Sequence, residues 1–163
     1  MKNNTYQLKA SMWVNLPLDE TYAFFDKAQN LQKITPEHLS FKILTPGHIT
    51  MQTGTVIDYI TTIAGFPMRW TSCIQEYDAP HRFIDTQLKG PYSYWHHEHR
   101  FEEHEGGTLI TDYVHYLLPM GIFGRIAHAL FVKKQLHTIF SYRNQKVCEI
   151  FDAPLDRTTL EFS

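Results

Sequence analysis

The sequence predicts an α+β fold in which one long C-terminal helix covers an antiparallel sheet. Apolar and polar residues alternate in seven separate segments, which is the period of a half-buried strand. Turn-forming pairs such as Pro46-Gly47 and Gly106-Gly107 separate these segments. Apolar residues within 121–151 recur near helical spacing instead. Consecutive hairpins give an antiparallel sheet, and the helix that follows must cover its apolar face.

The expected elements start with a strand over residues 5–14 and two short helices. Asp19 can cap the first helix, which runs through Ala28, and the second covers about residues 30–34. Six further strands follow at about 40–45, 53–64, 67–77, 82–89, 94–103 and 107–118. The helix from Gly121 to about Phe151 comes last, so the expected sheet has seven strands.

Composition indicates one folded domain over residues 1–163. Hydrophobic residues make up 43% of the chain and charged residues 20%, as in globular proteins. The net charge of −2 argues against a nucleic-acid binder, which normally carries a basic excess. Cys73 and Cys148 have no metal-ligand spacing and are expected to be free thiols. With no apolar signal segment and no run of about 18 apolar residues, the expected location is the cytoplasm.

Side chains of the segment 95–101 are expected to alternate between two faces, because neighbouring residues of a strand point to opposite sides. One face carries His96, Glu98, Arg100 and Glu102, which are suited to water. The other face carries Trp95, His97, His99 and Phe101, which combine two large aromatics with two titratable imidazoles. A face of this kind indicates the wall of a pocket.

A two-residue turn at Glu105-Gly106 would fix the pairing of this strand with the next one. The expected pairs are His104 with Gly107, Phe101 with Ile110, His99 with Asp112, His97 with Val114 and Trp95 with Tyr116. Opposed Cβ atoms on neighbouring strands lie about 4.5–5.5 Å apart. His99 is therefore expected to contact Asp112.

The preceding strand extends this pairing to a third strand and a second carboxylate. A five-residue loop around Gly90-Pro91 would place Phe83 opposite Phe101, Asp85 opposite His99 and Gln87 opposite His97. The expected result is a ladder of Asp85, His99 and Asp112. One pattern opposes it, because Ile84, Thr86 and Leu88 form the more apolar face and would turn Asp85 outward.

Several motifs resemble the bacterial ligand-binding branch of the START/polyketide-cyclase superfamily, also called SRPBCC or birch-pollen-allergen-like. They are Phe83-x-Asp85-x-Gln87-x-x-Gly90-Pro91, Trp95-x-His97-x-His99-x-Phe101, Thr108 through Asp112 to Tyr116-x-x-Pro119-x-Gly121-x-x-Gly124, and Leu136-x-x-Ile139-Phe140-x-x-Arg143. The early motif Asn30-Leu31-x-x-Ile34-Thr35-Pro36 and Trp70 followed by Ile74 also fit this branch. The resemblance covers nearly the whole chain and implies a helix-grip fold with a cavity between sheet and helix. It also favours Asp85 and Gln87 on the cavity side. Members of the superfamily bind lipids, polyketides, hormones or quinones, and some are cyclases or dehydratases.

The expected function is binding, as a carrier or sensor, of a small hydrophobic molecule such as a lipid, quinone or polyketide-like compound. The expected ligand-binding residues are Asp85, Gln87, His97, His99 and Asp112 for its polar end, and Tyr59, Trp70, Trp95, Phe101 and Tyr116 for its apolar part. The alternative is a cyclase- or dehydratase-like enzyme in which His99, Asp85 and Asp112 transfer protons. A third interpretation is an interaction module whose interior is filled.

The pair His97-x-His99 also resembles a zinc site, which Asp85 or Asp112 could complete. The competing interpretation is a buried hydrogen-bonded network in which the carboxylates fix the histidines. His-x-His is a weak signal in a chain with ten histidines, so neither a metal nor another cofactor is expected.

Partner expectations rest on two apolar surfaces. The segment 121–132 is apolar nearly all round and has Arg125, Lys133 and Lys134 nearby, which suggests transient membrane contact. The alternative is a buried helix start followed by a solvated basic turn. Ile84 and Leu88 on an outer face indicate a homodimer. Arg143 is expected to form a surface ion pair, and the alternative is that it reaches a carboxylate at the far end of the helix.

Overall fold

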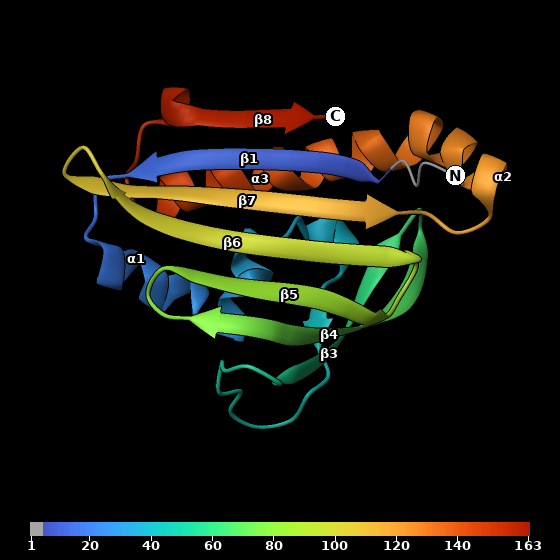
Figure 1. Cartoon of the computed structure of the whole chain (residues 1–163), viewed down its shortest axis with the longest axis horizontal. Coiled ribbons are helices and arrows are strands. Elements are labelled where there is room, and N and C mark those ends of the chain that lie inside the picture. Colours follow the sequence, from blue (N-terminus) through green and yellow to red (C-terminus); the bar gives the residue numbers. More distant parts are fainter. Residues whose placement is uncertain (1–4) are drawn as a thin grey trace.

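The computed structural model describes residues 5–163, so the first four residues of the expected domain lie outside the described part. The elements are β1 (Tyr6–Val14), α1 (Leu18–Phe25), 3-10 helices η1 (Ala28–Ile34) and η2 (Glu37–Leu39), β2 (Lys42–Ile43), β3 (Val56–Ile63), β4 (Phe66–Asp78), β5 (Arg82–Lys89), β6 (Tyr94–His104), β7 (Gly107–Leu117), α2 (Gly121–Ala127), the π-helical turn η3 (His128–Val132), α3 (Lys133–Ile150), η4 (Leu155–Arg157) and β8 (Thr158–Phe162). Figure 1 shows their arrangement.

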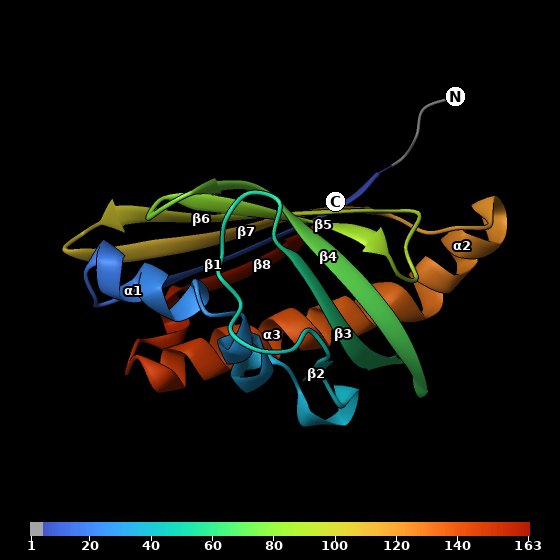
Figure 2. The same cartoon turned by 90° about the horizontal axis from the view of Figure 1, so that it is seen from below.

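One antiparallel sheet has the strand order β2-β3-β4-β5-β6-β7-β1-β8, and α3 crosses one of its faces (Figure 2). The predicted α+β architecture of a sheet around a C-terminal helix is confirmed. The sheet has eight strands instead of the predicted seven, because β8 returns after the helix to pair with β1. The expected strand at 40–45 is reduced to the two residues of β2.

The helical segments differ in detail from their prediction. Asp19 lies in the first turn of α1 and is not its cap, since the helix begins at Leu18 after Pro17. The second short helix is of the 3-10 type. The long C-terminal span is confirmed, but residues 128–132 widen into a π-helical turn between α2 and α3.

The predicted pairing of β6 with β7 is confirmed, including His99 opposite Asp112 and Trp95 opposite Tyr116. The predicted pairing of β5 with β6 is wrong by two residues, because Asp85 lies opposite His97 instead of His99. Side chains alternate with a period of two, so this shift leaves every residue on its predicted face. Asp85 therefore still faces inward.

The outer face of β5 is less exposed than its sequence suggests. Ile84 is buried, whereas Leu88 is exposed. Ile84 lies between Glu76 of β4 and Glu98 of β6 in the sheet, whose side chains flank it. The predicted apolar pair therefore does not form one exposed surface. Within residues 5–163, no helix combines the length and apolar character needed to cross a membrane.

Candidate functional site

A cavity of about 190 Å³ lies between the sheet and α3. Its walls are mostly apolar and come from the segment around η1 and η2, from β3 to β6 and from α3. The lining includes Tyr59, Ile63, Trp70, Ser72, Asp85, Tyr92, Trp95, His97, His99, Gln135, Ile139 and Arg143. Six of the ten predicted ligand-binding residues are among them: Tyr59, Trp70, Asp85, Trp95, His97 and His99.

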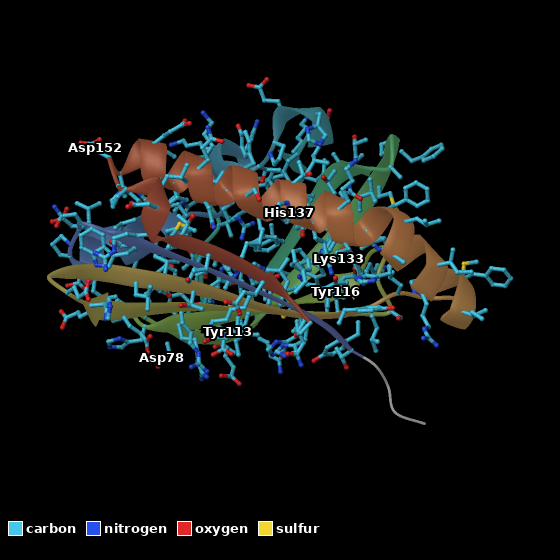
Figure 3. The ribbon with its side chains drawn as sticks, turned by 90° about the horizontal axis from the view of Figure 1, so that it is seen from above. Asp78, Tyr113, Tyr116, Lys133, His137 and Asp152 are labelled. Carbon is cyan, nitrogen blue, oxygen red and sulfur yellow. The ribbon has the colours of Figure 1, made fainter. Side chains whose placement is uncertain are left out.

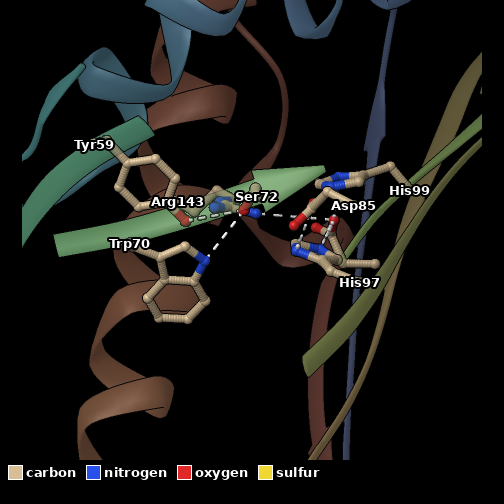
Figure 4. A network of polar contacts seen from close by, with 8 residues as sticks. Tyr59, Trp70, Ser72, Asp85, His97, His99 and Arg143 are labelled. Atoms are coloured by element: carbon tan, nitrogen blue, oxygen red, sulfur yellow. Dashed lines mark hydrogen bonds and ion pairs between the residues drawn. The ribbon is translucent and has the colours of Figure 1, made fainter. Parts of the chain in front are cut away.

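Asp85, His97 and His99 form the polar wall of this cavity (Figure 4), and Asp112 contacts both histidines without lining it. His99 lies between the carboxylates, with Nε2 2.8 Å from Asp85 Oδ2 and Nδ1 3.0 Å from Asp112 Oδ1. His97 Nε2 lies 2.7 Å from the same Asp112 oxygen, and its Nδ1 lies 3.6 Å from Asp85 Oδ2. Asp112 thus contacts both imidazoles from behind, while Asp85 faces them from the cavity side.

The protonation states of this cluster follow from burial and mutual contact. Burial alone would raise the pKa of Asp112, but hydrogen bonds from His97 and His99 hold it well below its usual value. Burial also opposes ionisation of Asp85, and the contacts with both histidines nevertheless lower its pKa. Burial disfavours the charged form of His99, yet Asp112 and Asp85 raise its pKa. The pKa of His97 is lowered by burial and by the charge of His99. These directions favour the ionised form of both carboxylates, the charged form of His99 and the neutral form of His97.

Arg143 is buried, with 7% of its surface exposed, so its predicted role in a surface ion pair is wrong. Its Nη1 lies 3.8 Å from Asp112 Oδ1, and its Nε atom is buried without a hydrogen-bond partner. The guanidinium lies over the ring of Phe140 and lines the cavity. Burying a cation whose N–H donors lack acceptors costs folding free energy, unless a further acceptor forms a hydrogen bond with them.

Aromatic side chains form the wall next to this cluster. Tyr59 stacks on Trp70 with ring centroids 5.8 Å apart, and Trp70 meets Trp95 edge-on at 5.2 Å. The indole Nε1 of Trp70 donates to Ser72 Oγ at 3.1 Å, and the Tyr59 hydroxyl lies 3.4 Å from the same atom (Figure 4). Burial keeps the pKa of Tyr59 well above its usual value, so its phenol stays neutral. This wall offers flat apolar surface with few polar atoms.

Four predicted site residues lie outside the cavity lining. Asp112 lies behind the histidines, as described. The Gln87 side chain contacts the backbone of Tyr92, its Nε2 donating to the carbonyl at 2.7 Å and its Oε1 accepting from N–H at 3.2 Å. Phe101 packs against residues of α1 in the core. The Tyr116 hydroxyl lies 2.8 Å from His128 Nε2.

The cavity residues that were not predicted to bind the ligand include Ser72, Tyr92 and Arg143. For Arg143, the sequence did contain a signal, since it follows Phe140 by three positions and precedes Val147 by four, on the apolar face of α3. Ser72 and Trp70 lie on the same face of β4 by alternation. Tyr92 lies in a loop, where no periodicity places its side chain.

Asp85, His97 and His99 are the one group in the described residues 5–163 whose ligand atoms lie close enough together to hold a metal ion. The two imidazole rings stack with centroids 3.8 Å apart and planes 28° apart. Nitrogen lone pairs of nearly parallel rings run side by side and do not converge on one point. A metal ion would require one ring to turn, so the geometry fits a hydrogen-bonded network better.

Comparisons with known proteins identify the fold. No family model and no curated protein matches the chain. Among solved structures, TTHA0849 from Thermus thermophilus matches with a TM-score of 0.70 at 18% identity, covering 88% of this chain and 94% of its own. CV1439 from Chromobacterium violaceum matches with a TM-score of 0.69 at 10% identity, over 91% and 98%. Major latex-like protein 151 from Panax ginseng matches with a TM-score of 0.66 at 12% identity, over 90% and 97%.

These similarities define the class of protein by its architecture. The chain has the helix-grip fold, as its sequence motifs predicted. Identities this low show the fold and leave the ligand to be argued from the site itself.

Proposed function

We propose that this protein binds a small hydrophobic molecule carrying a polar group, in the cavity between the sheet and α3. The observation that carries the proposal is the cavity itself, which combines an aromatic wall with a buried charged cluster. Cavities of about 150 Å³ already hold a benzene molecule. The volume of about 190 Å³ therefore fits a compact molecule with one or two rings.

The polar wall supports a ligand group that both donates and accepts hydrogen bonds. Asp112 accepts a hydrogen bond from His97 Nε2, so the neutral His97 carries its lone pair on Nδ1. That lone pair faces Asp85 Oδ2 at 3.6 Å, which places two acceptors opposite each other. A hydroxyl or phenol hydrogen would suit this pair, and the oxygen could accept from Arg143. The proposed ligand is thus a compact hydroxylated aromatic or polyketide-like compound.

Native mass spectrometry of freshly purified protein, followed by denaturation and mass analysis, tests this function. The expected result is a bound organic molecule that is released on unfolding. Ile139→Trp fills the cavity from α3 and should abolish the bound mass. Ile150→Trp makes the same change on an exposed part of the same helix and should retain it. Equal retention by both variants, or purified protein that binds no hydroxylated aromatic compound in a titration, would refute the proposal.

One observation favours a second function, an acid–base enzyme of the cyclase or dehydratase kind. His99 is a cavity-lining imidazole whose pKa is raised by two carboxylates, as suits a general acid. The two functions differ in the effect of His99→Gln. A binder would lose affinity only in part, whereas an enzyme would keep its ligand and stop converting it, which mass analysis of the released compound detects.

A further inference from the structure

The end of the molecule that carries α2 exposes an unusual set of large apolar side chains. They are Met120, Ile122, Phe123, Ile126, Leu130 and Phe131, and each has more than half of its surface in contact with solvent. α2 projects past the end of the sheet in Figures 1 and 2, and side chains of this end point outward in Figure 3. Soluble proteins rarely expose apolar residues in one contiguous group of this kind. We call these six residues the apolar tip.

The apolar tip is held in place from its inner side by polar contacts. His128 is buried, with Nε2 2.8 Å from the Tyr116 hydroxyl and its ring stacked on Tyr6 at 3.5 Å. Gly124 approaches the chain before it so closely that a Cβ would lie 2.2 Å from the Pro119 carbonyl oxygen. The segment therefore turns a histidine inward and its apolar side chains outward. This is the reverse of the usual pattern for a surface helix.

The charged side chains in the segment that carries the apolar tip are all positive. Residues 113–148 contain no Asp or Glu. Arg125, Lys133 and Lys134 are exposed, and none of them forms an ion pair within residues 5–163. Two copies of such a surface would repel each other, whereas an anionic surface would attract it. An apolar helix with a basic flank has the character of an interfacial membrane anchor.

The apolar tip lies beside the proposed ligand cavity. The hairpin that joins β3 to β4 lies at the same end of the molecule as α2 (Figures 1 and 2), and its Phe66 is 72% exposed. The cavity lining reaches toward this end through Ile63 on the hairpin side and Gln135 on α3. A membrane against the apolar tip would therefore face the end of the cavity that lies between these elements.

We propose that the apolar tip, together with Arg125, Lys133 and Lys134, docks this protein onto an anionic phospholipid surface. The apolar side chains enter the boundary between headgroups and acyl chains, and the basic residues contact the headgroup phosphates. The docking is peripheral and reversible. It does not depend on the proposed ligand, so the two proposals can fail separately.

Vesicle flotation of the full chain tests the docking. The protein should float with vesicles of equal parts phosphatidylcholine and phosphatidylglycerol and much less with phosphatidylcholine alone. High salt should weaken the association, because it screens the headgroup charges. The double variant Arg125→Gln/Lys134→Gln should bind about 30-fold more weakly, since each basic residue contributes about five-fold.

The apolar contribution is tested with Phe123→Ser/Phe131→Ser, which should weaken vesicle binding on the order of 100-fold. The matched control is Leu88→Ser/Leu155→Ser, which removes two exposed apolar residues elsewhere and should bind like the unmodified protein. Circular dichroism shows that each variant is folded. No flotation of the unmodified protein would overturn the proposal. So would a dimer in analytical ultracentrifugation that Phe123→Ser/Phe131→Ser dissociates, because a second copy would then cover the apolar tip.

Discussion

His99 and Asp112 lie directly opposite each other on β6 and β7, with Nδ1 3.0 Å from Oδ1. The same Asp112 oxygen lies 2.7 Å from His97 Nε2 and 3.8 Å from Arg143 Nη1. One buried carboxylate oxygen thus faces three basic groups, two from β6 and one from α3. Asp112 is therefore the electrostatic centre of the polar cluster, although it does not line the cavity.

Asp112→Asn should destabilise the fold strongly. The amide removes the negative charge that His97, His99 and Arg143 share, and breaking a buried ion pair from one side costs about 3–5 kcal/mol. The free energy of unfolding from urea denaturation measures this loss. Glu103→Gln, at an exposed position of β6, is the control and should change it by less than about 0.5 kcal/mol. A loss below about 1 kcal/mol for Asp112→Asn would show that the charge of Asp112 contributes little.

The protonation of His99 gives stability a defined pH dependence. Its folded pKa is raised above the unfolded value of about 6.5, so the folded state binds this proton more tightly. The stabilisation is complete below about pH 6.5 and is lost as pH rises through the raised pKa. The difference in unfolding free energy between the unmodified protein and His99→Gln should therefore be largest near pH 6 and shrink toward about pH 9. A constant difference over this range would mean that the pKa of His99 does not differ between the folded and unfolded states.

The sequence predicted those features of the structure that depend on residues close together in the chain. The turn at Glu105-Gly106 is short enough to fix the pairing of β6 with β7, which brought His99 to Asp112. The pairing of β5 with β6 depends on the longer loop that joins these two strands. The pairing ends at Thr86, and the Gln87 side chain donates a hydrogen bond to the carbonyl of Tyr92 in that loop. No residue pattern encodes that loop length. The error of two residues did not change the predicted site, because it left Asp85 on the inward face of the sheet.

The remaining differences come from contacts between distant segments. The helical spacing of Arg143 places it on the apolar face of α3, but that spacing does not identify Asp112 of β7 as its partner. Phe101 and Tyr116 do point inward as predicted. The sheet is covered at its two ends by α1 and by the His128 segment, so both residues pack in the core beside the cavity. Which part of an inward face lines a cavity depends on these covering elements.

Phe101→Ala should reduce stability by about 3–5 kcal/mol, since a large buried ring is replaced by a void. Phe101 is fully buried and contacts Tyr22 and Phe25, with ring centroids 5.1 and 5.2 Å away. Phe66→Ala is the matched control, because Phe66 is exposed at the β3–β4 turn. Thermal and urea unfolding of both variants measure the effect. Similar losses for the two variants would contradict the placement of Phe101 in the core.

Gly124→Ala should destabilise the protein, although the same change in an ordinary helix interior stabilises it by about 1 kcal/mol. The added Cβ would lie 2.2 Å from the Pro119 carbonyl oxygen, so α2 must move away from the turn before it. That movement would strain the contact of His128 with Tyr116, which anchors the segment. The control is Thr138→Ala at an exposed position of α3, where the better helix former should be neutral or slightly stabilising. An increase in the free energy of unfolding for Gly124→Ala would show that α2 does not need the close approach to Pro119, and that the apolar tip is held by His128 alone.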